Sequence, residues 1–247
     1  MGDGTLAAEA PNIHPTDPEY AAEQYSSEYY QSVLRNRTFR SHRWRLKWMG
    51  QCIDPRPGDR VLDLGCGAGL AADFLSSHGA IVHGVDLSEI AVKTAREVNA
   101  ANKDATFEVA DASSLSHLAS ESFDKALSAD VTEHCGYDTM IGIFREAFRL
   151  LRPGGTYFIY TPNPLHWIER LEKWGLFPRD PTHTGLRTAP VIVDALQSVG
   201  FEIAMHPEPP SMIPVFNWFE KLWSMQPVFR QLGIYRIVLL ARKPSRD

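Results

Sequence analysis

Between residues 60 and 163 the sequence alternates short apolar runs with amphipathic stretches, and this alternation constrains the fold more than any other feature. A short apolar run that ends in a glycine or an acid is typical of a buried parallel strand. The predicted strands are RVLDLG (60–65), AIVHGVD (80–86), ATFEVAD (105–111), FDKALSAD (123–130) and GTYFIYTPN (155–163). Since parallel strands need crossover connections, the chain is predicted to form an α/β sheet with helices on both faces.

The segments outside this series set the predicted domain boundaries. Residues 1–18 are rich in alanine, glycine, proline and acid, and are expected to form a flexible tail. Residues 19–54 have helical periodicity and are expected to form a cap. The remainder, 55–247, is one predicted domain with two aromatic inserts, 164–189 and 208–234.

Composition excludes several classes of protein. The net charge of −5, from 25 basic and 30 acidic residues, disfavours a nucleic-acid partner, although the basic stretch 35–48 is the one feature that favours RNA. The three cysteines are scattered and form no C-x-x-C, which indicates a reducing compartment. No secretory signal and no run of roughly 18 apolar residues is found, so a cytoplasmic location is expected. Segment 211–233 is aromatic and could contact a membrane surface, another subunit or a substrate, or pack against the domain.

A glycine-rich loop follows the first predicted strand in VLDLGCGAGL. Gly65, Gly67 and Gly69 would let a ligand approach the backbone at the start of a helix. The dinucleotide fingerprint requires a glycine where this chain has Leu70, so that class is disfavoured. Asp63 would repel a diphosphate but attract an ammonium or sulfonium group.

The next two strands also end in acids. Asp86 is placed to accept both hydroxyls of a ribose, and Asp111 to accept from an adenine amino group while Ala112 donates its backbone N–H. A ligand with an amino-acid end, a ribose and a base, but no phosphate, is S-adenosylmethionine. The predicted donor site is completed by Leu87, Asp130 and Arg43.

Five motifs occur in the order and spacing of a known family: VLDLGCGAG, GVDLS, VADASSL, FDKALSADVTEH and LRPGG. In these the chain resembles the class I S-adenosylmethionine-dependent methyltransferases. That resemblance implies a Rossmann-like seven-stranded sheet whose last strand, here about 235–243, is antiparallel. TPNPLHWIERL and the DPTHTGLRT region further resemble the demethylubiquinone O-methyltransferase group. The segment after 205 departs from that group, so the acceptor is not implied.

The stretch SADVTEHCG lies at the carboxyl edge of the predicted sheet, where ligands bind in such folds. His134 is the first candidate for a base or orienting group on the acceptor, with Glu133 in support. His183 in the first insert is a second candidate, and His166 a weaker one; a structural hydrogen-bonding role is the alternative for each histidine.

The same stretch also allows a metal site. If residues 130–134 form a helical turn, Asp130, Glu133 and His134 share one face and could hold a magnesium-like ion. The resembling group carries an acid-x-x-Glu-His pattern associated with a divalent cation. In this chain Asp replaces the first Glu, and its shorter arm could weaken the site.

The predicted function is methyl transfer from S-adenosylmethionine to a small molecule, at a hydroxyl oxygen of an aromatic or lipophilic acceptor. The alternatives are methylation of protein or RNA, and a non-catalytic module that only binds the donor.

Overall fold

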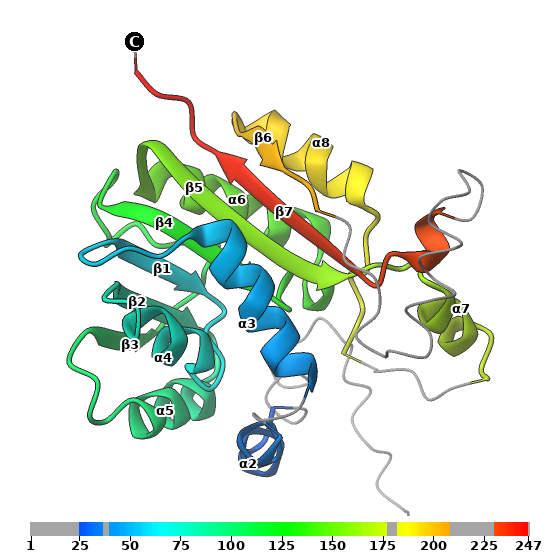
Figure 1. The fold of residues 1–247 in the computed structure, drawn as a ribbon, viewed down its shortest axis with the longest axis horizontal. Coiled ribbons are helices and arrows are strands. Elements are labelled where there is room, and N and C mark those ends of the chain that lie inside the picture. Colours follow the sequence, from blue (N-terminus) through cyan, green and yellow to red (C-terminus); the bar gives the residue numbers. More distant parts are fainter. Residues whose placement is uncertain (1–24, 37–39, 177–181, 208–229, 247) are drawn as a thin grey trace, which may run out of the picture.

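The computed structural model describes residues 25–36, 40–176, 182–207 and 230–246. Within them, one seven-stranded sheet has the order β3-β2-β1-β4-β5-β7-β6 (Figure 1). Strand β7 is antiparallel to its neighbours β5 and β6, and the other pairings are parallel. The strands are β1 (Arg60–Leu64), β2 (Ile81–Asp86), β3 (Ala105–Val109), β4 (Phe123–Ala129), β5 (Leu151–Pro162), β6 (Glu202–Met205) and β7 (Arg236–Arg242). The predicted sheet and its antiparallel last strand are confirmed.

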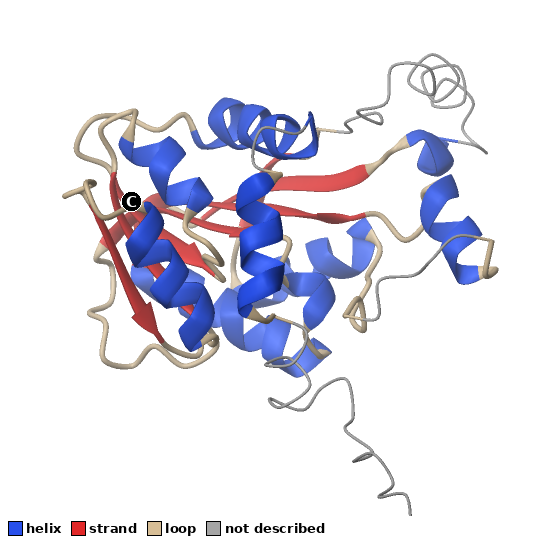
Figure 2. Cartoon of the chain, turned by 90° about the horizontal axis from the view of Figure 1, so that it is seen from below, coloured by secondary structure: helices blue, strands red, loops and turns tan. Residues whose placement is uncertain are grey.

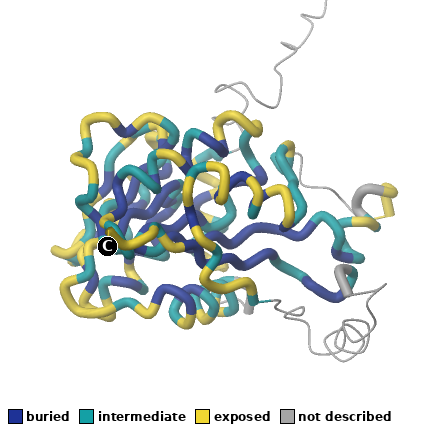
Figure 3. Tube along the Cα trace, turned by 90° about the horizontal axis from the view of Figure 1, so that it is seen from above, coloured by how far each residue is buried: buried dark blue, intermediate teal, exposed yellow. Residues whose placement is uncertain are grey.

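Helices cover both faces of the sheet (Figure 1). On one face lie α3 (Arg40–Ile53), α4 (Leu70–Ser76) and α5 (Glu89–Val98), which bury Met49, Leu75 and Val92 against the strands. On the other lie α6 (Tyr137–Leu150) and α8 (Ala189–Val199), whose core includes Phe144 and Leu196. Figure 3 shows the buried segments running through the central strands, with exposed chain at the periphery. The core therefore consists of two apolar layers with the sheet between them.

The predicted N-terminal cap is divided into two helices, α2 (Ser27–Arg35) and α3. Ser26 caps α2, because its side chain accepts a hydrogen bond from the backbone N–H of Tyr29. Tyr30 of α2 is buried, and its ring lies 3.9 Å from where a Cβ on Gly67 would stand. The cap thus reaches the glycine loop.

Several predicted segments lie outside the described residues. The tail 1–18 is one, and most of the insert 208–234 is another; of that insert, the structure describes the short 3-10 helix η2 (Arg230–Gly233) and Ile234. In the insert 164–189, helix α7 (Trp167–Lys173) lies beyond the end of β5 and apart from the sheet (Figures 1 and 2). Among the described helices, none has the length and apolarity needed to cross a bilayer.

The predicted start of the fifth strand was wrong. The strand begins at Leu151 rather than at Gly155, because Leu151 already pairs with Phe123 before a register shift in β4. Gly154 accommodates this early start with a φ of 80°.

Candidate active site

The loop between β1 and α4 carries the three predicted donor-site glycines. Gly65, Gly67 and Gly69 have φ values of 80°, 50° and 71°, in the region where L side chains are strained. A Cβ on Gly65 would stand 2.5 Å from Cγ2 of Val131, and one on Gly69 would stand 2.7 Å from Nδ2 of Asn99. Glycine is therefore required by both the backbone conformation and the close packing of the loop.

Asp63 lies beneath this loop and is 2% exposed. Its Oδ2 atom is buried and has no hydrogen-bond partner among the described residues. Burial raises the pKa of Asp63 to about 7, although the charge of Arg45 opposes the increase. A buried carboxylate oxygen without a partner is costly, and a cationic ligand group would satisfy it. This fits the predicted contact with the ammonium group of S-adenosylmethionine.

Asp86, at the end of β2, fastens the glycine loop to the start of α5. Its Oδ2 accepts from the N–H of Gly67 at 2.9 Å, and its Oδ1 accepts from the N–H of Ser88 at 2.9 Å. Burial raises the pKa of Asp86, and the two amide hydrogen bonds lower it again. Each oxygen retains a lone pair for a ribose hydroxyl. The predicted neighbour Leu87 is 71% exposed.

Asp111 lies in the connection after β3, two residues beyond the end of that strand, and is exposed. Its Oδ1 accepts from the backbone N–H and the hydroxyl of Ser113, at 2.8 and 2.7 Å. The neighbouring Ala112 is buried. The adenine contacts expected for these two residues stay predictions, and the turn with Ser113 orients the carboxylate that would make one of them.

Asp130 is held between two arginines at the end of β4. Arg45 donates to its Oδ2 at 2.9 Å, and Arg236 donates to its Oδ1 at 3.3 Å. Burial acts to raise the pKa of Asp130, but the charges of Arg236 and Arg45 outweigh it and lower the pKa. Its own N–H donates to the carbonyl of Tyr160. The carboxylate therefore has cationic partners from the cap and from β7.

Arg45 contacts the predicted site residue Asp130, whereas the sequence interpretation named Arg43 for the donor site, and that assignment stays a prediction. Arg43 is exposed, whereas Arg45 reaches the sheet edge. Arg45 lies four residues before the buried Met49, so both occupy the inner face of α3. The spacing of four residues between Arg45 and the apolar Met49 therefore distinguishes Arg45 from Arg43 in the sequence.

The condition set above for a shared face, a helical turn over 130–134, is met only in part. A 3-10 helix, η1, spans only Thr132–His134, and Asp130 has a φ of 57° outside it. The hydrogen bonds to Tyr160 and the two arginines fix Asp130 in this conformation. Asp130 therefore does not share a helical face with Glu133 and His134.

Glu133 is 1% exposed, and its Oε2 accepts from the hydroxyl of Thr161 at 2.9 Å. Burial, followed by the charge of Asp130, raises the pKa of Glu133 to about 8. Burial therefore favours the protonated form of Glu133 over the carboxylate. Its Oε1 is buried and lies 4.0 Å from Nε2 of His134.

The His134 ring has a defined orientation. Its Nδ1 lies 3.0 Å from the hydroxyl of Tyr25 and 3.1 Å from the carbonyl oxygen of Thr182. A carbonyl oxygen only accepts, so the contact with Thr182 is a hydrogen bond when Nδ1 carries the proton. In neutral His134 the basic nitrogen is then Nε2, on the side of Glu133.

The structure brings the three predicted catalytic residues together. One ligand-type atom each from Glu133, His134 and His183 lies within 4.8 Å of the others, and the two imidazole centroids are 5.2 Å apart. A carboxylate with two imidazoles could hold a divalent cation. This set differs from the one predicted, because His183 takes the place of Asp130.

Arg187 was not predicted, yet it joins the first insert to this turn. Its guanidinium donates to the carbonyl oxygens of Thr132 and Cys135, both at 2.9 Å. Gly185 adds a hydrogen bond from its N–H to the carbonyl of Glu133 at 2.7 Å. Nothing in the local sequence pattern distinguishes Arg187 from a surface arginine, because its partners are backbone atoms far away in the chain.

His166 has a structural environment. It is fully buried, its Nδ1 accepts from the N–H of Ile168 at 3.3 Å, and its ring packs edge-on against Tyr235. These contacts fix the start of α7.

A cavity of about 350 Å³ lies between the cap and the sheet edge. Its lining includes Tyr29, Val33, His42, Arg45, Asp130 and Arg236. Burial lowers the pKa of His42 to about 4, so that side chain is neutral at pH 7. Two guanidiniums then face one carboxylate, and the cavity has a surplus positive charge.

Comparisons with known proteins agree with this geometry. Residues 62–159 match the family described as Methyltransferase domain. The chain is 31% identical over 206 residues to 24-methylenesterol C-methyltransferase 2 of Oryza sativa subsp. japonica, covering 75% of this chain and 54% of that protein. It is 33% identical over 120 residues to ubiquinone biosynthesis O-methyltransferase of Thiobacillus denitrificans, covering 48% and 50%. The chain spans about half the length of these curated relatives.

Solved structures share the fold. Phosphoethanolamine N-methyltransferase 2 of Haemonchus contortus, in complex with S-adenosyl-L-methionine, has a TM-score of 0.69 at 19% identity, covering 95% of this chain and 60% of that one. The sheet order and the glycine loop are those of the class I S-adenosylmethionine-dependent methyltransferase fold, and the central part of the chain matches the methyltransferase-domain family.

Proposed function

We propose that this protein transfers a methyl group from S-adenosylmethionine to a hydroxyl oxygen of a small aromatic or lipophilic acceptor. The observation that carries the proposal is the pairing of His134 with Glu133 at the carboxyl edge of the sheet, within electrostatic reach of Asp130, which lines the cation-rich cavity. The cavity is continuous with the donor loop, since Leu70 lines it and Arg45 reaches Asp130 across it.

The donor side of the site needs no base. S-adenosylmethionine supplies a methyl group that is already activated by its sulfonium, so the protein has to align the reactants and exclude water. Asp63 offers its buried oxygen to the ammonium group, and Asp86 offers lone pairs to the ribose. Tyr30 and the rest of α2 lie over the glycine loop and shield it from solvent.

On the side of the methyl acceptor, the site needs a base. As the oxygen–carbon bond forms and the sulfur–carbon bond breaks, the hydroxyl proton passes to Nε2 of His134. Tyr25 and the carbonyl of Thr182 hold Nδ1 and so fix the ring. The surplus positive charge of Arg45 and Arg236 favours a developing phenolate.

Glu133 supports this proton transfer. Its carboxyl group lies 4.0 Å from the nitrogen that becomes cationic. A positive charge on His134 favours the ionised form of Glu133, so the two groups are expected to titrate together.

A divalent cation on Glu133, His134 and His183 would be a second way to lower the pKa of the acceptor hydroxyl. The two mechanisms are separable by exhaustive chelation. A base at His134 predicts activity that survives chelation, and a metal mechanism predicts loss and recovery with added Mg²⁺.

Methyl transfer to carbon is the second candidate reaction. It is supported by the similarity to a sterol C-methyltransferase, which extends over 75% of this chain. In that reaction the base would remove a proton from carbon after transfer, and His134 and Glu133 would serve equally well.

The test is incubation of the purified protein with methyl-labelled donor and a panel of phenols, catechols and sterols, followed by product mass spectrometry. The proposal expects O-methylated products from wild-type protein and far less from His134→Gln. Donor binding without any labelled product would favour a non-catalytic module, and labelled RNA or protein would favour a macromolecular acceptor.

A further inference from the structure

Helix α2 and the residue that leads into it contact both halves of the candidate active site. Tyr30 is buried and packs against Ala68 and Leu70, which belong to the glycine loop and the start of α4. Tyr25, which precedes the helix, packs against the same apolar cluster and extends to His134. One short segment therefore connects the predicted donor loop with the proposed base.

The contact between Tyr25 and His134 is directed at one ring nitrogen. The Tyr25 hydroxyl oxygen lies 3.0 Å from Nδ1 of His134, and the two rings meet edge to face with centroids 5.9 Å apart. The carbonyl oxygen of Thr182 lies 3.1 Å from the same nitrogen and has no proton to donate. A proton on Nδ1 makes both contacts favourable, whereas a bare Nδ1 would set its lone pair against that carbonyl oxygen.

Two acceptors on Nδ1 change the basicity of the other ring nitrogen. An acceptor of Nδ1–H interacts more strongly with the imidazolium than with the neutral ring, so each one favours proton uptake at Nε2. The titratable groups on other sides of the ring include Glu133, 4.0 Å from Nε2, and His183, at a centroid distance of 5.2 Å. Asp130, at the end of β4, is also within electrostatic reach of His134. Tyr25 adds its contribution from the N-terminal cap.

We propose that Tyr25 is a positioning residue for methyl transfer, whose hydroxyl oxygen accepts from Nδ1 of His134 and so strengthens Nε2 as the base. The packing of Tyr30 on the glycine loop holds Tyr25 in place for this contact. The inference rests on the proposed role of His134, and it adds that the base depends on the cap.

The anchoring role of Tyr30 follows from the size and burial of α2. The helix has nine residues, and a helix of that length is marginal without tertiary contacts. All nine are described, and Tyr30 is the buried one among them. Tyr25 itself is half-buried, so its position depends on where Tyr30 holds the helix. The packing at the donor loop therefore decides whether the base is complete.

The test is nuclear magnetic resonance of the full chain with ¹⁵N-labelled histidine, in which the imidazole signals of His134 are assigned by their loss in His134→Gln. The pKa of His134 is measured by titration of wild type, Tyr25→Phe and Tyr137→Phe. Phenylalanine keeps the ring and removes only the hydroxyl, so Tyr25→Phe should lower the pKa of His134 by about half a unit to one unit. Tyr137, an exposed tyrosine at the start of α6, is the matched control, and its variant should titrate as wild type does.

A second variant tests the anchor. Tyr30→Ala should lower the pKa of His134 as Tyr25→Phe does, because Tyr25 is no longer held against the ring. In the double variant the two shifts should not add, since both substitutions remove the same hydrogen bond.

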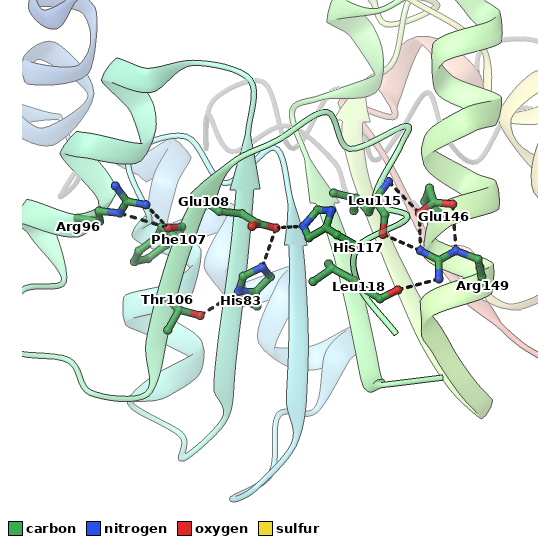
Figure 4. Close-up of polar contacts among 10 residues, drawn as sticks. All are labelled: His83, Arg96, Thr106, Phe107, Glu108, Leu115, His117, Leu118, Glu146 and Arg149. Carbon is green, nitrogen blue, oxygen red and sulfur yellow. Dashed lines mark hydrogen bonds and ion pairs between the residues drawn. The ribbon is translucent and has the colours of Figure 1, made fainter. Parts of the chain in front are cut away.

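The polar cluster around Glu108 supplies an internal reference (Figure 4). His83 of β2 and His117 of the connection to β4 both contact Oε1 of Glu108, with Nε2–Oε1 distances of 3.1 and 2.8 Å. These hydrogen bonds do not involve α2, so the imidazole signals of His83 and His117 should be the same in all variants. Signals that stay the same show that a shift at His134 comes from the lost contact and not from a general change of the fold.

Steady-state assays separate this inference from the proposed function. With an acceptor from the panel above, Tyr25→Phe should lower kcat about 3- to 10-fold and leave the affinity for S-adenosylhomocysteine within about twofold. Wild-type protein that forms no methylated product would refute the proposed function, while the titration would still report on Tyr25.

Three results of the titration overturn the inference. The first is an unchanged pKa of His134 in Tyr25→Phe. The second is a raised pKa in that variant, which would show that the hydroxyl donates to a neutral ring. The third is an unchanged pKa in Tyr30→Ala, which would show that the helix does not link the donor loop to the base.

Discussion

Replacing Glu133 by glutamine should change how the stability of the protein depends on pH. The ordinary pKa of a glutamate is 4.5, and burial with the charge of Asp130 raises that of Glu133 to about 8. Between these values the folded protein keeps a proton that the unfolded chain releases. The contribution of the protonated Glu133 carboxyl to the free energy of unfolding is complete below pH 4.5. It is lost as the pH rises toward 8, because the folded state then has to hold a proton that the unfolded chain has released.

The size of the effect follows from linkage. One proton held only by the folded state costs about 1.4 kcal/mol of unfolding free energy per pH unit, or on the order of 2–3 kcal/mol between pH 5 and pH 7. Glutamine keeps the acceptor for Thr161 but has no proton to lose. Relative to wild type, Glu133→Gln should therefore gain stability as the pH increases.

The assay is urea unfolding at several pH values between 5 and 8, without donor present. Glu97→Gln, an exposed glutamate on α5, is the matched control and should parallel wild type throughout. If the free energies of unfolding of wild type and Glu133→Gln changed in parallel with pH, the claim that Glu133 is protonated in the folded protein would be refuted.

Three further predictions follow from contacts in the site. His134→Gln should lower kcat at least 100-fold while leaving the calorimetric affinity for S-adenosylhomocysteine within twofold; an equal loss of both would contradict its role as the base. Arg187→Met should lower kcat more than donor affinity in steady-state assays, because the turn that carries Glu133 loses the hydrogen bonds to its carbonyl oxygens. Arg187→Lys should recover part of the loss. Gly69→Ala should destabilise the protein by about 1–3 kcal/mol in urea unfolding, since its φ is 71° and a Cβ would clash. Gly136→Ala, at the N-cap of α6 with open space around it and a negative φ, should cost less than Gly69→Ala, within about 1 kcal/mol of wild type.

The sheet could be predicted because its signals are local. Each strand is a short apolar run, and Asp63 and Asp86 lie at strand ends, so the parallel topology alone brings them to one edge. The glycine loop could also be predicted locally, since glycines at the alternate positions 65, 67 and 69 are suited to three residues with positive φ, which the structure shows.

The contacts that complete the site could not be predicted in the same way. Tyr25 reaches His134 across 109 residues, and Arg187 binds backbone carbonyls 52 and 55 residues away. Backbone partners leave no side-chain signature in the sequence. The conformation of Asp130 could not be read from a local helical pattern, because its arginine partners come from α3 and β7, far away in the chain.

The central claim is that the edge formed by Asp63, Asp86 and the glycine loop binds S-adenosylmethionine. Calorimetric titration of wild-type protein with S-adenosylhomocysteine tests it most directly. The account predicts one bound molecule per chain, and about 10- to 100-fold weaker binding by Asp86→Asn, which loses a charged acceptor. No binding by folded wild-type protein, or equal binding by Asp86→Asn, would contradict it.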